Sequence, residues 1–128
     1  MNIQTHQSID RDLCGDPVSL SEGRSLVRMA TTPAMAADSS GLVHGGFVFG
    51  MADYAAMLAV NHPNVVLGSA ESSFLKPVKA GDLLEAEASV KQESGRKRTV
   101  EVTVRRGETA VMTGTFLCFV LDKHVLEQ

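Results

Sequence analysis

Residues 47–60 read FVFGMADYAAMLAV, and this stretch decides the fold. On a helix drawn through it, apolar side chains cover almost every side, and Asp53 is the single charge. The run 61–64, NHPN, follows it with turn residues and a helix-breaking proline, so a helix over about 46–60 is predicted. At 14 residues with an acid near its centre, the stretch is too short and too polar to cross a bilayer, so we expect protein to bury it on all sides.

The rest of the chain supplies the strands that can cover such a helix. A first strand is predicted over 24–31, and a connection rich in Pro, Ser and Asp follows it. After Pro63 the sequence period changes from helical to alternating, with apolar and polar residues taking turns. Four further strands are predicted over 65–78, 84–91, 99–105 and 110–121. This order favours an α+β fold in which an antiparallel sheet of five or so strands wraps around one long central helix.

Composition and charge narrow the class of protein. The 128 residues include 12 Lys and Arg against 15 Asp and Glu, a net charge of −3, and 44% are hydrophobic. We expect a single domain over 1–128 with an irregular leader over 1–23. The acidic balance and six aromatic residues argue against nucleic-acid binding. The charged run 10–12 interrupts any secretion signal, so a cytoplasmic protein without a membrane partner is expected. Cys14 and Cys118 lack metal-site spacing and are predicted to be free thiols.

Asp53 is the first candidate for chemistry. A carboxylate in an apolar helix costs several kcal/mol unless it is paired, hydrogen-bonded or neutralised. One interpretation is structural, with Asp53 bonded to a backbone or partner group. The other is functional, because burial raises a carboxyl pKa toward the range in which it exchanges protons and can attack or activate water.

The tripeptide His44-Gly45-Gly46 is the second candidate. Two glycines at a helix start let a ligand approach the backbone and leave N–H groups without intrahelical acceptors. Such donors suit an oxyanion, because they stabilise negative charge that develops on an oxygen. Glycine pairs also occur in plain turns, and His44 is either a hydrogen-bonding turn residue or a base.

Two motifs carry a resemblance to a known family. The runs LVHGGFVFGMAD at 42–53 and FLKPVKAGD at 74–82 resemble the hotdog-fold acyl-CoA thioesterases of the phenylacetate-pathway, PaaI-like type, over about residues 24–121. The resemblance implies that the Gly45 N–H binds the thioester carbonyl and that Asp53 acts as nucleophile or general base. It implies an acyl-CoA substrate, no cofactor or metal, and a homodimer whose subunits each give one of these groups. Pairing into a dimer of dimers stays open.

Further site residues are less firmly placed by the motifs. Asp38, six positions before the motif histidine, corresponds to a polar position of the family and could orient water or raise the pKa of Asp53 by repulsion. A Ser or Thr near the acyl group corresponds to Ser69, with Ser72 and Ser73 as alternatives. Gly46 is expected to join Gly45 in binding substrate.

A basic segment lies late in the chain. Residues 91–106 hold six basic and two acidic side chains, a local charge of +4. Arg96, Lys97 and Arg98 are candidates for holding the phosphates of coenzyme A, because guanidinium forks match phosphate oxygens. The plain alternative is a solvated hairpin.

A second resemblance points to a different class of function. Residues 74–121, with GRKRTVEV at 95–102, are similar to the effector domain of malonyl-CoA-responsive repressors of fatty-acid synthesis. Those domains bind an acyl-CoA without hydrolysing it and typically lack the helix acid. Because this chain has Asp53, a thioester hydrolase is favoured, and an acyl-CoA-binding sensor is the alternative. A hydratase is less favoured because no His/Asp dyad is apparent.

Overall fold

The computed structural model describes all residues, 1–128. Its elements are α1 (Arg11–Cys14), β1 (Asp16–Ser21), β2 (Arg24–Ala30), the 3-10 turn η1 (Pro33–Met35), α2 (Gly45–Val60), β3 (Val65–Phe74), β4 (Leu83–Ser94), β5 (Lys97–Arg106), β6 (Thr109–Val120) and η2 (Val125–Glu127).

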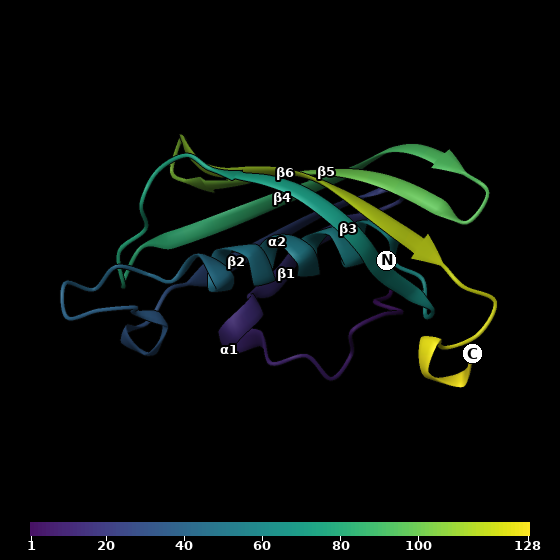
Figure 1. Cartoon of the computed structure of the whole chain (residues 1–128), viewed down its shortest axis with the longest axis horizontal. Coiled ribbons are helices and arrows are strands. Elements are labelled where there is room, and N and C mark those ends of the chain that lie inside the picture. Colours follow the sequence, from purple (N-terminus) through teal and green to yellow (C-terminus); the bar gives the residue numbers. More distant parts are fainter.

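One antiparallel sheet curls over one helix (Figure 1). The strand order is β1-β2-β4-β5-β6-β3, so β1 and β3 form the two edges. The side chains of Val100, Val102 and Val104 are buried, as their alternation along β5 predicts. The predicted hotdog fold is confirmed, with six strands where about five were expected.

The helix α2 begins at Gly45, one residue before the predicted start, and ends at Val60. Nine of its residues are buried. Asn61 stops it in the left-handed conformation, with φ of 50°, and its N–H donates to the carbonyl of Met57. The buried hydroxyl of Ser25 on β2 donates to the carbonyl of Ala55 at 2.6 Å, which ties the helix to the sheet.

The leader over 1–23 is not irregular throughout, because it contains α1 and β1. Both elements are too short to show a clear sequence period. Asp10 caps α1 by accepting from the Asp12 N–H at 2.9 Å. In β1, Pro17 and a register shift before Ser19 interrupt the alternation, and both features are common in edge strands.

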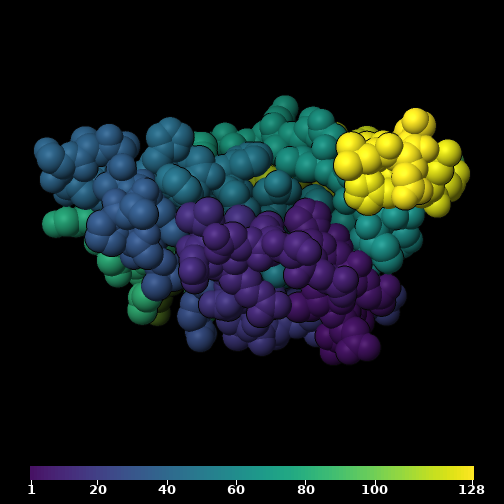
Figure 2. All heavy atoms as spheres, turned by 90° about the horizontal axis from the view of Figure 1, so that it is seen from below, coloured from purple at the N-terminus to yellow at the C-terminus, as the bar shows by residue number.

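The leader covers the side of α2 that the sheet leaves open. Figure 2 shows the N-terminal residues, in purple, spread across this face. The side chain of Asn61 accepts from the Gln4 N–H and donates to the Asn2 carbonyl, each at 2.8 Å. The ring of His6 lies 6.2 Å from that of Tyr54, centroid to centroid. The apolar helix is therefore covered from both sides.

Gly15, between α1 and β1, generates a prediction about stability. Its φ of 96° and ψ of 174° belong almost only to glycine, and a Cβ there would lie 2.7 Å from Val27 Cγ1. Gly15→Ala is expected to lower the free energy of unfolding by about 2–4 kcal/mol. Gly107→Ala is the control, because its φ is 59° but its Cβ would meet nothing. We expect this control to lose only about 1 kcal/mol. Denaturant titration measures both, and equal losses would contradict the steric argument.

Candidate functional site

His44 organises the start of α2. Its Nδ1 accepts the N–H of Gly46 at 2.9 Å, which caps the helix. A Cβ at Gly46 would lie 2.9 Å from the same nitrogen, so the cap needs glycine there. The Gly46 N–H is therefore engaged within the chain. This use of His44 and Gly46 is the turn-stabilising alternative that the sequence left open, and the expected substrate contact of Gly46 is not made by its N–H in this arrangement.

Of the two glycines, Gly45 is the one whose N–H has no acceptor in the chain. As the first residue of α2, its N–H has no acceptor within the helix, and it bonds to no side chain or loop carbonyl. A Cβ on Gly45 would lie 3.2 Å from the ring of Phe74 at the end of β3. Phe74 is 54% exposed, so the helix start opens onto an apolar surface. A carbonyl oxygen placed here would gain a hydrogen bond.

Asp53 lies in the middle of α2, and its carboxylate has no partner in the chain. Its Oδ1 is buried without a hydrogen bond, and none of the four ion pairs includes it. Burial raises the pKa of Asp53 from 3.8 to about 6. The structural interpretation required a bond to a neighbouring backbone or to a partner chain, and the chain itself supplies none. The carboxylate therefore stays available for chemistry.

The charge of Asp53 acts on two thiols. Burial, and secondarily the negative charge of Asp53, raise the pKa of Cys118 on β6 to about 12 and also raise that of Cys14 at the end of α1. Both cysteines are free, as predicted, and stay protonated at neutral pH. Protonated thiols do not compete with the carboxylate as a base.

Gly45 and Asp53 do not meet within one chain. They lie eight positions apart on the same helix, which is about 12 Å along its axis at a rise of 1.5 Å per residue. One thioester carbon cannot contact both groups of a single subunit. That the two groups come from different subunits stays a prediction.

Asp38 lies on the exposed loop before α2. Its Oδ1 accepts from the N–H and the hydroxyl of Ser40, at 2.9 and 2.6 Å, and these bonds hold its pKa below the usual value. The raised pKa of Asp53 has burial as its cause. Within one chain, therefore, Asp38 does not act on Asp53 by repulsion, and its role in orienting water stays a prediction. Ser69 lies exposed on the edge strand β3, beside the register shift that follows Leu67.

The basic residues lie at the far end of the helix from Gly45. Arg96 is in the turn between β4 and β5, which borders a depression shared with His62, just past the end of α2. Arg96 pairs with Asp122, and Arg98 lies 3.5 Å from Glu93. Lys97 begins β5 and has no ion pair.

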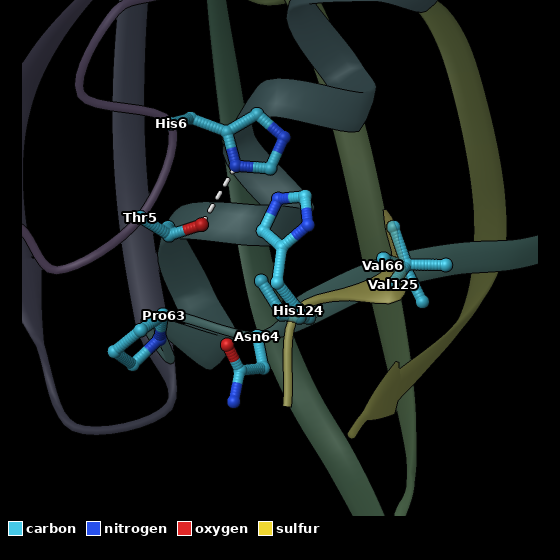
Figure 3. A pocket seen from close by; sticks show the side chains of 8 residues that line it. Thr5, His6, Pro63, Asn64, Val66, His124 and Val125 are labelled. Carbon is cyan, nitrogen blue, oxygen red and sulfur yellow. Dashed lines mark hydrogen bonds between the residues drawn. The ribbon is translucent and has the colours of Figure 1, made fainter. Parts of the chain in front are cut away.

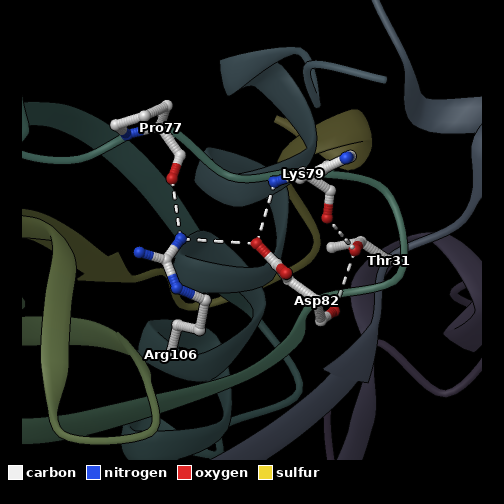
Figure 4. Close-up of polar contacts among 5 residues, drawn as sticks. All are labelled: Thr31, Pro77, Lys79, Asp82 and Arg106. Atoms are coloured by element: carbon white, nitrogen blue, oxygen red, sulfur yellow. Dashed lines mark hydrogen bonds and ion pairs between the residues drawn. The ribbon is translucent and has the colours of Figure 1, made fainter. Parts of the chain in front are cut away.

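A polar cluster that the sequence analysis missed fixes the loop beside the helix start (Figure 4). Asp82 Oδ2 accepts from the Lys79 N–H at 2.8 Å and from Arg106 Nη1 at 3.3 Å. The hydroxyl of Thr31 donates to the carbonyls of Lys79 and Asp82, at 3.1 and 2.8 Å. The carbonyl of Val78 in the same loop accepts the N–H of Val43 at 2.8 Å. The second sequence motif thus holds the loop that leads into His44, where Leu42 also forms an isolated bridge with Lys79. Thr31 and Arg106 carry no local sequence signal for this role.

A separate cavity of about 260 Å³ lies near the end of α2 (Figure 3). His6 and His124 line it from the two ends of the chain, together with Asn64. No acidic side chain lines this cavity, and neither Gly45 nor Asp53 does.

Two further findings concern metals and membranes. Nowhere do three or more His, Cys, Asp or Glu side chains gather in a way that could hold a metal ion. None of the helices has the length and apolar character needed to span a membrane.

Curated relatives support both resemblances. The family model described as "Thioesterase superfamily" matches residues 40–113. The chain is 50% identical over 95% of its length to methylthioribose-1-phosphate isomerase of Aquifex aeolicus, but spans only 27% of that longer protein. It is 27% identical over 91% of its length to the transcription factor FapR of Caldanaerobacter subterraneus, and covers 59% of it. With acyl-coenzyme A thioesterase PaaI of Escherichia coli the identity is 29%, over 77% of this chain and 75% of the relative.

Solved structures agree with this grouping. The uncharacterized protein PH1136 from Pyrococcus horikoshii superposes with a TM-score of 0.97 at 52% identity, covering 98% of this chain and 97% of that one. The smu.793 protein of Streptococcus mutans, solved bound to acetyl CoA, has a TM-score of 0.77 at 26% identity, over 86% and 90% of the two chains. Because the family model covers more than half of a chain that also has the hotdog fold, this protein belongs to the thioesterase superfamily.

Proposed function

We propose that the protein hydrolyses an acyl-CoA thioester to the free acid and coenzyme A. The observation that carries the proposal is the Asp53 carboxylate, which is unpartnered and has a pKa raised to about 6. At neutral pH most of it is ionised, yet it accepts a proton more readily than an ordinary aspartate. The similarity to the PaaI thioesterase and to a protein solved with acetyl CoA supports the substrate class.

The reaction needs one donor and one carboxylate at the thioester. The Gly45 N–H polarises the carbonyl oxygen and stabilises the charge that develops there, an effect worth about 3 kcal/mol. Asp53 then acts in one of two ways. As a nucleophile it adds to the carbonyl carbon and expels the CoA thiolate, and water cleaves the resulting anhydride. As a general base it takes a proton from water, which adds to the carbon before the thiolate leaves.

A second copy of the chain completes the site. The edge strand β3 is ten residues long, mostly exposed, and carries Glu71 as its single charge. The other edge, β1, is shorter and is interrupted by Pro17. Both edges carry a register shift, so the difference lies in length and in Pro17. A long free edge is a template for pairing, whereas a short edge strand that contains proline resists it. We therefore infer a two-fold dimer formed along β3, in which Gly45 of one subunit meets Asp53 of the other.

This dimer also gives the basic turn a role. The Val120 N–H donates to the Arg96 carbonyl at 2.9 Å, and Val120 pairs with Val65 at the start of β3. Phe74, at the other end of β3, packs on Gly45. Antiparallel pairing of two β3 strands places the start of one beside the end of the other. The basic turn of one subunit then lies toward the helix start of its partner, where Arg96, Lys97 and Arg98 can bind CoA phosphates.

A non-catalytic acyl-CoA sensor is the second candidate function. The observation in its favour is the 27% identity to FapR over 91% of the chain. A sensor binds acyl-CoA saturably and releases no thiol over hours. Asp53 counts against it, because a half-buried carboxylate with an unpartnered buried oxygen lowers stability and has no use in binding a thioester.

Asp53→Asn tests the proposed chemistry. The amide keeps the size of the side chain but neither attacks a carbonyl nor accepts a proton at neutral pH, so kcat should fall at least a hundredfold. Thiol release from a panel of acyl-CoAs measures this. Circular dichroism and native mass confirm that the variant is folded and assembled. Unchanged turnover would refute the assigned role.

The pH dependence tests the same carboxylate. Because Asp53 must be ionised, kcat/KM should rise with pH through about 6 and then level off. Its raised pKa also means that the folded state holds a proton which the unfolded state has already released. The free energy of unfolding should therefore fall by up to about 2–3 kcal/mol as pH rises from 4 to 7. Asp53→Asn should lack this component. A kcat/KM that stays flat from pH 5 to 8 would exclude Asp53 as the group that titrates.

Mixed dimers test whether the site is shared. Gly45→Pro removes the N–H, and proline suits the first position of a helix. Gly45→Ala is its control, because it keeps the N–H. Asp53→Asn and Gly45→Pro homodimers should both be nearly inactive. After unfolding and refolding together, half of the dimers are mixed and each has one intact site, so about a quarter of wild-type activity should return. No recovery, with mixed dimers detected by mass, would show that both groups act within one subunit.

A further inference from the structure

Gly50 is a glycine that the fold of the single chain does not require. It lies in the interior of α2 with ordinary helical geometry and no positive φ. Glycine weakens a helix interior relative to alanine, so an unneeded glycine there is a disadvantage. A Cβ added at Gly50 would meet no atom within 4 Å. The other two glycines of α2 differ, because a Cβ at Gly45 would meet Phe74 and one at Gly46 would meet His44.

The empty space lies one turn from Asp53. Residues three and four apart are neighbours on a helix, so four positions of α2 flank Asp53. Ala56 and Met57, on the C-terminal side, are fully buried in the core. Phe49, on the N-terminal side, packs toward the sheet with its ring 5.4 Å from that of Phe116. Of these four positions, the half-buried Gly50 is the one at which a side chain would enter open space.

We propose that this space receives the acyl group, so that residue 50 sets the largest acyl chain the protein accepts. The inference rests on the proposed function, since Asp53 must lie at the thioester carbonyl. When the thioester carbonyl lies at Asp53, the first carbons of the acyl group lie within one helical turn of it. On this helix, the open space beside Gly50 can hold them.

The surroundings also indicate the chemical class of the acyl group. Phe47, one turn before Gly50, is a partly exposed apolar side chain. Asp53 is the only charge in the helix, and its carboxylate repels a second one. The space therefore suits an uncharged hydrocarbon chain and disfavours a dicarboxylic acyl group such as malonyl.

The test is a size series at position 50. Gly50→Ala, Gly50→Val and Gly50→Leu are assayed for kcat/KM with unbranched acyl-CoAs from acetyl to decanoyl, and with malonyl-CoA. Each increase in side-chain size should shorten the longest chain that is hydrolysed. For Gly50→Leu we expect a loss of at least about tenfold with octanoyl-CoA and less than about threefold with acetyl-CoA. Malonyl-CoA should be the poorest substrate of wild type.

Val60→Leu is the matched control, because it adds one methylene to the far end of the same helix and should leave the chain-length profile unchanged. Equal losses on all substrates in the Gly50 series would overturn the inference while the proposed function stands. Dissociation of Gly50→Leu dimers, seen by native mass, would also overturn it, because the space would then belong to the partner subunit.

Binding of non-hydrolysable thioether analogues separates failure of this inference from failure of the proposed function. If wild type hydrolyses nothing but binds these analogues, and the Gly50 series shortens the chain that binds, hydrolysis is refuted and the acyl space is upheld. If wild type neither hydrolyses acyl-CoAs nor binds the analogues, both proposals fall.

Discussion

The burial of α2 is the constraint on which the rest of the structure depends. A helix with apolar side chains on every side cannot rest on a sheet by one face alone, because the opposite face would stay in water. The sheet curls over one side, and the leader, fixed to Asn61, lies across the other. The same burial acts on Asp53, because one oxygen of this half-buried acid is shielded from water and finds no partner within the chain. Fold and chemistry thus share one cause.

The two ends of α2 carry different groups. Its start carries a donor without an acceptor, held in place by the His44 cap and by the loop that Asp82 and Arg106 fix. Its end carries the left-handed Asn61, the leader and the basic turn between β4 and β5. One chain keeps these ends a helix length apart. An antiparallel pairing of two chains is the arrangement that brings unlike ends together.

Much of this could be predicted from the sequence, because it depends on local patterns. The period of the apolar residues located α2 and most strands, and a lone acid in an apolar run identified Asp53. What could not be predicted depends on contacts between distant segments. The α1 and β1 elements are too short to show a period. The use of the Gly46 N–H by His44 requires a side-chain orientation that no pattern encodes. Thr31 and Arg106 reach Asp82 only after the sheet has formed. The open space beside Gly50 depends on how the whole chain packs, because it is defined by the lack of any atom within 4 Å of an added Cβ.

The unequal edges of the sheet have a consequence for growth of the assembly. A polymer grows from units that have two reactive ends, whereas units with one reactive end stop at a pair. A chain with two pairing sheet edges and a chain with one differ in the same way. In the proposed dimer the ten-residue β3 corresponds to such a reactive end, and the six-residue β1, with Pro17, corresponds to a terminated one. If the dimer forms along β3 as proposed, only the two β1 edges are left free, and these disfavour the further edge-to-edge addition that builds a fibre. In that assembly the short strand β1, which the sequence pattern did not reveal, would limit the growth of the sheet.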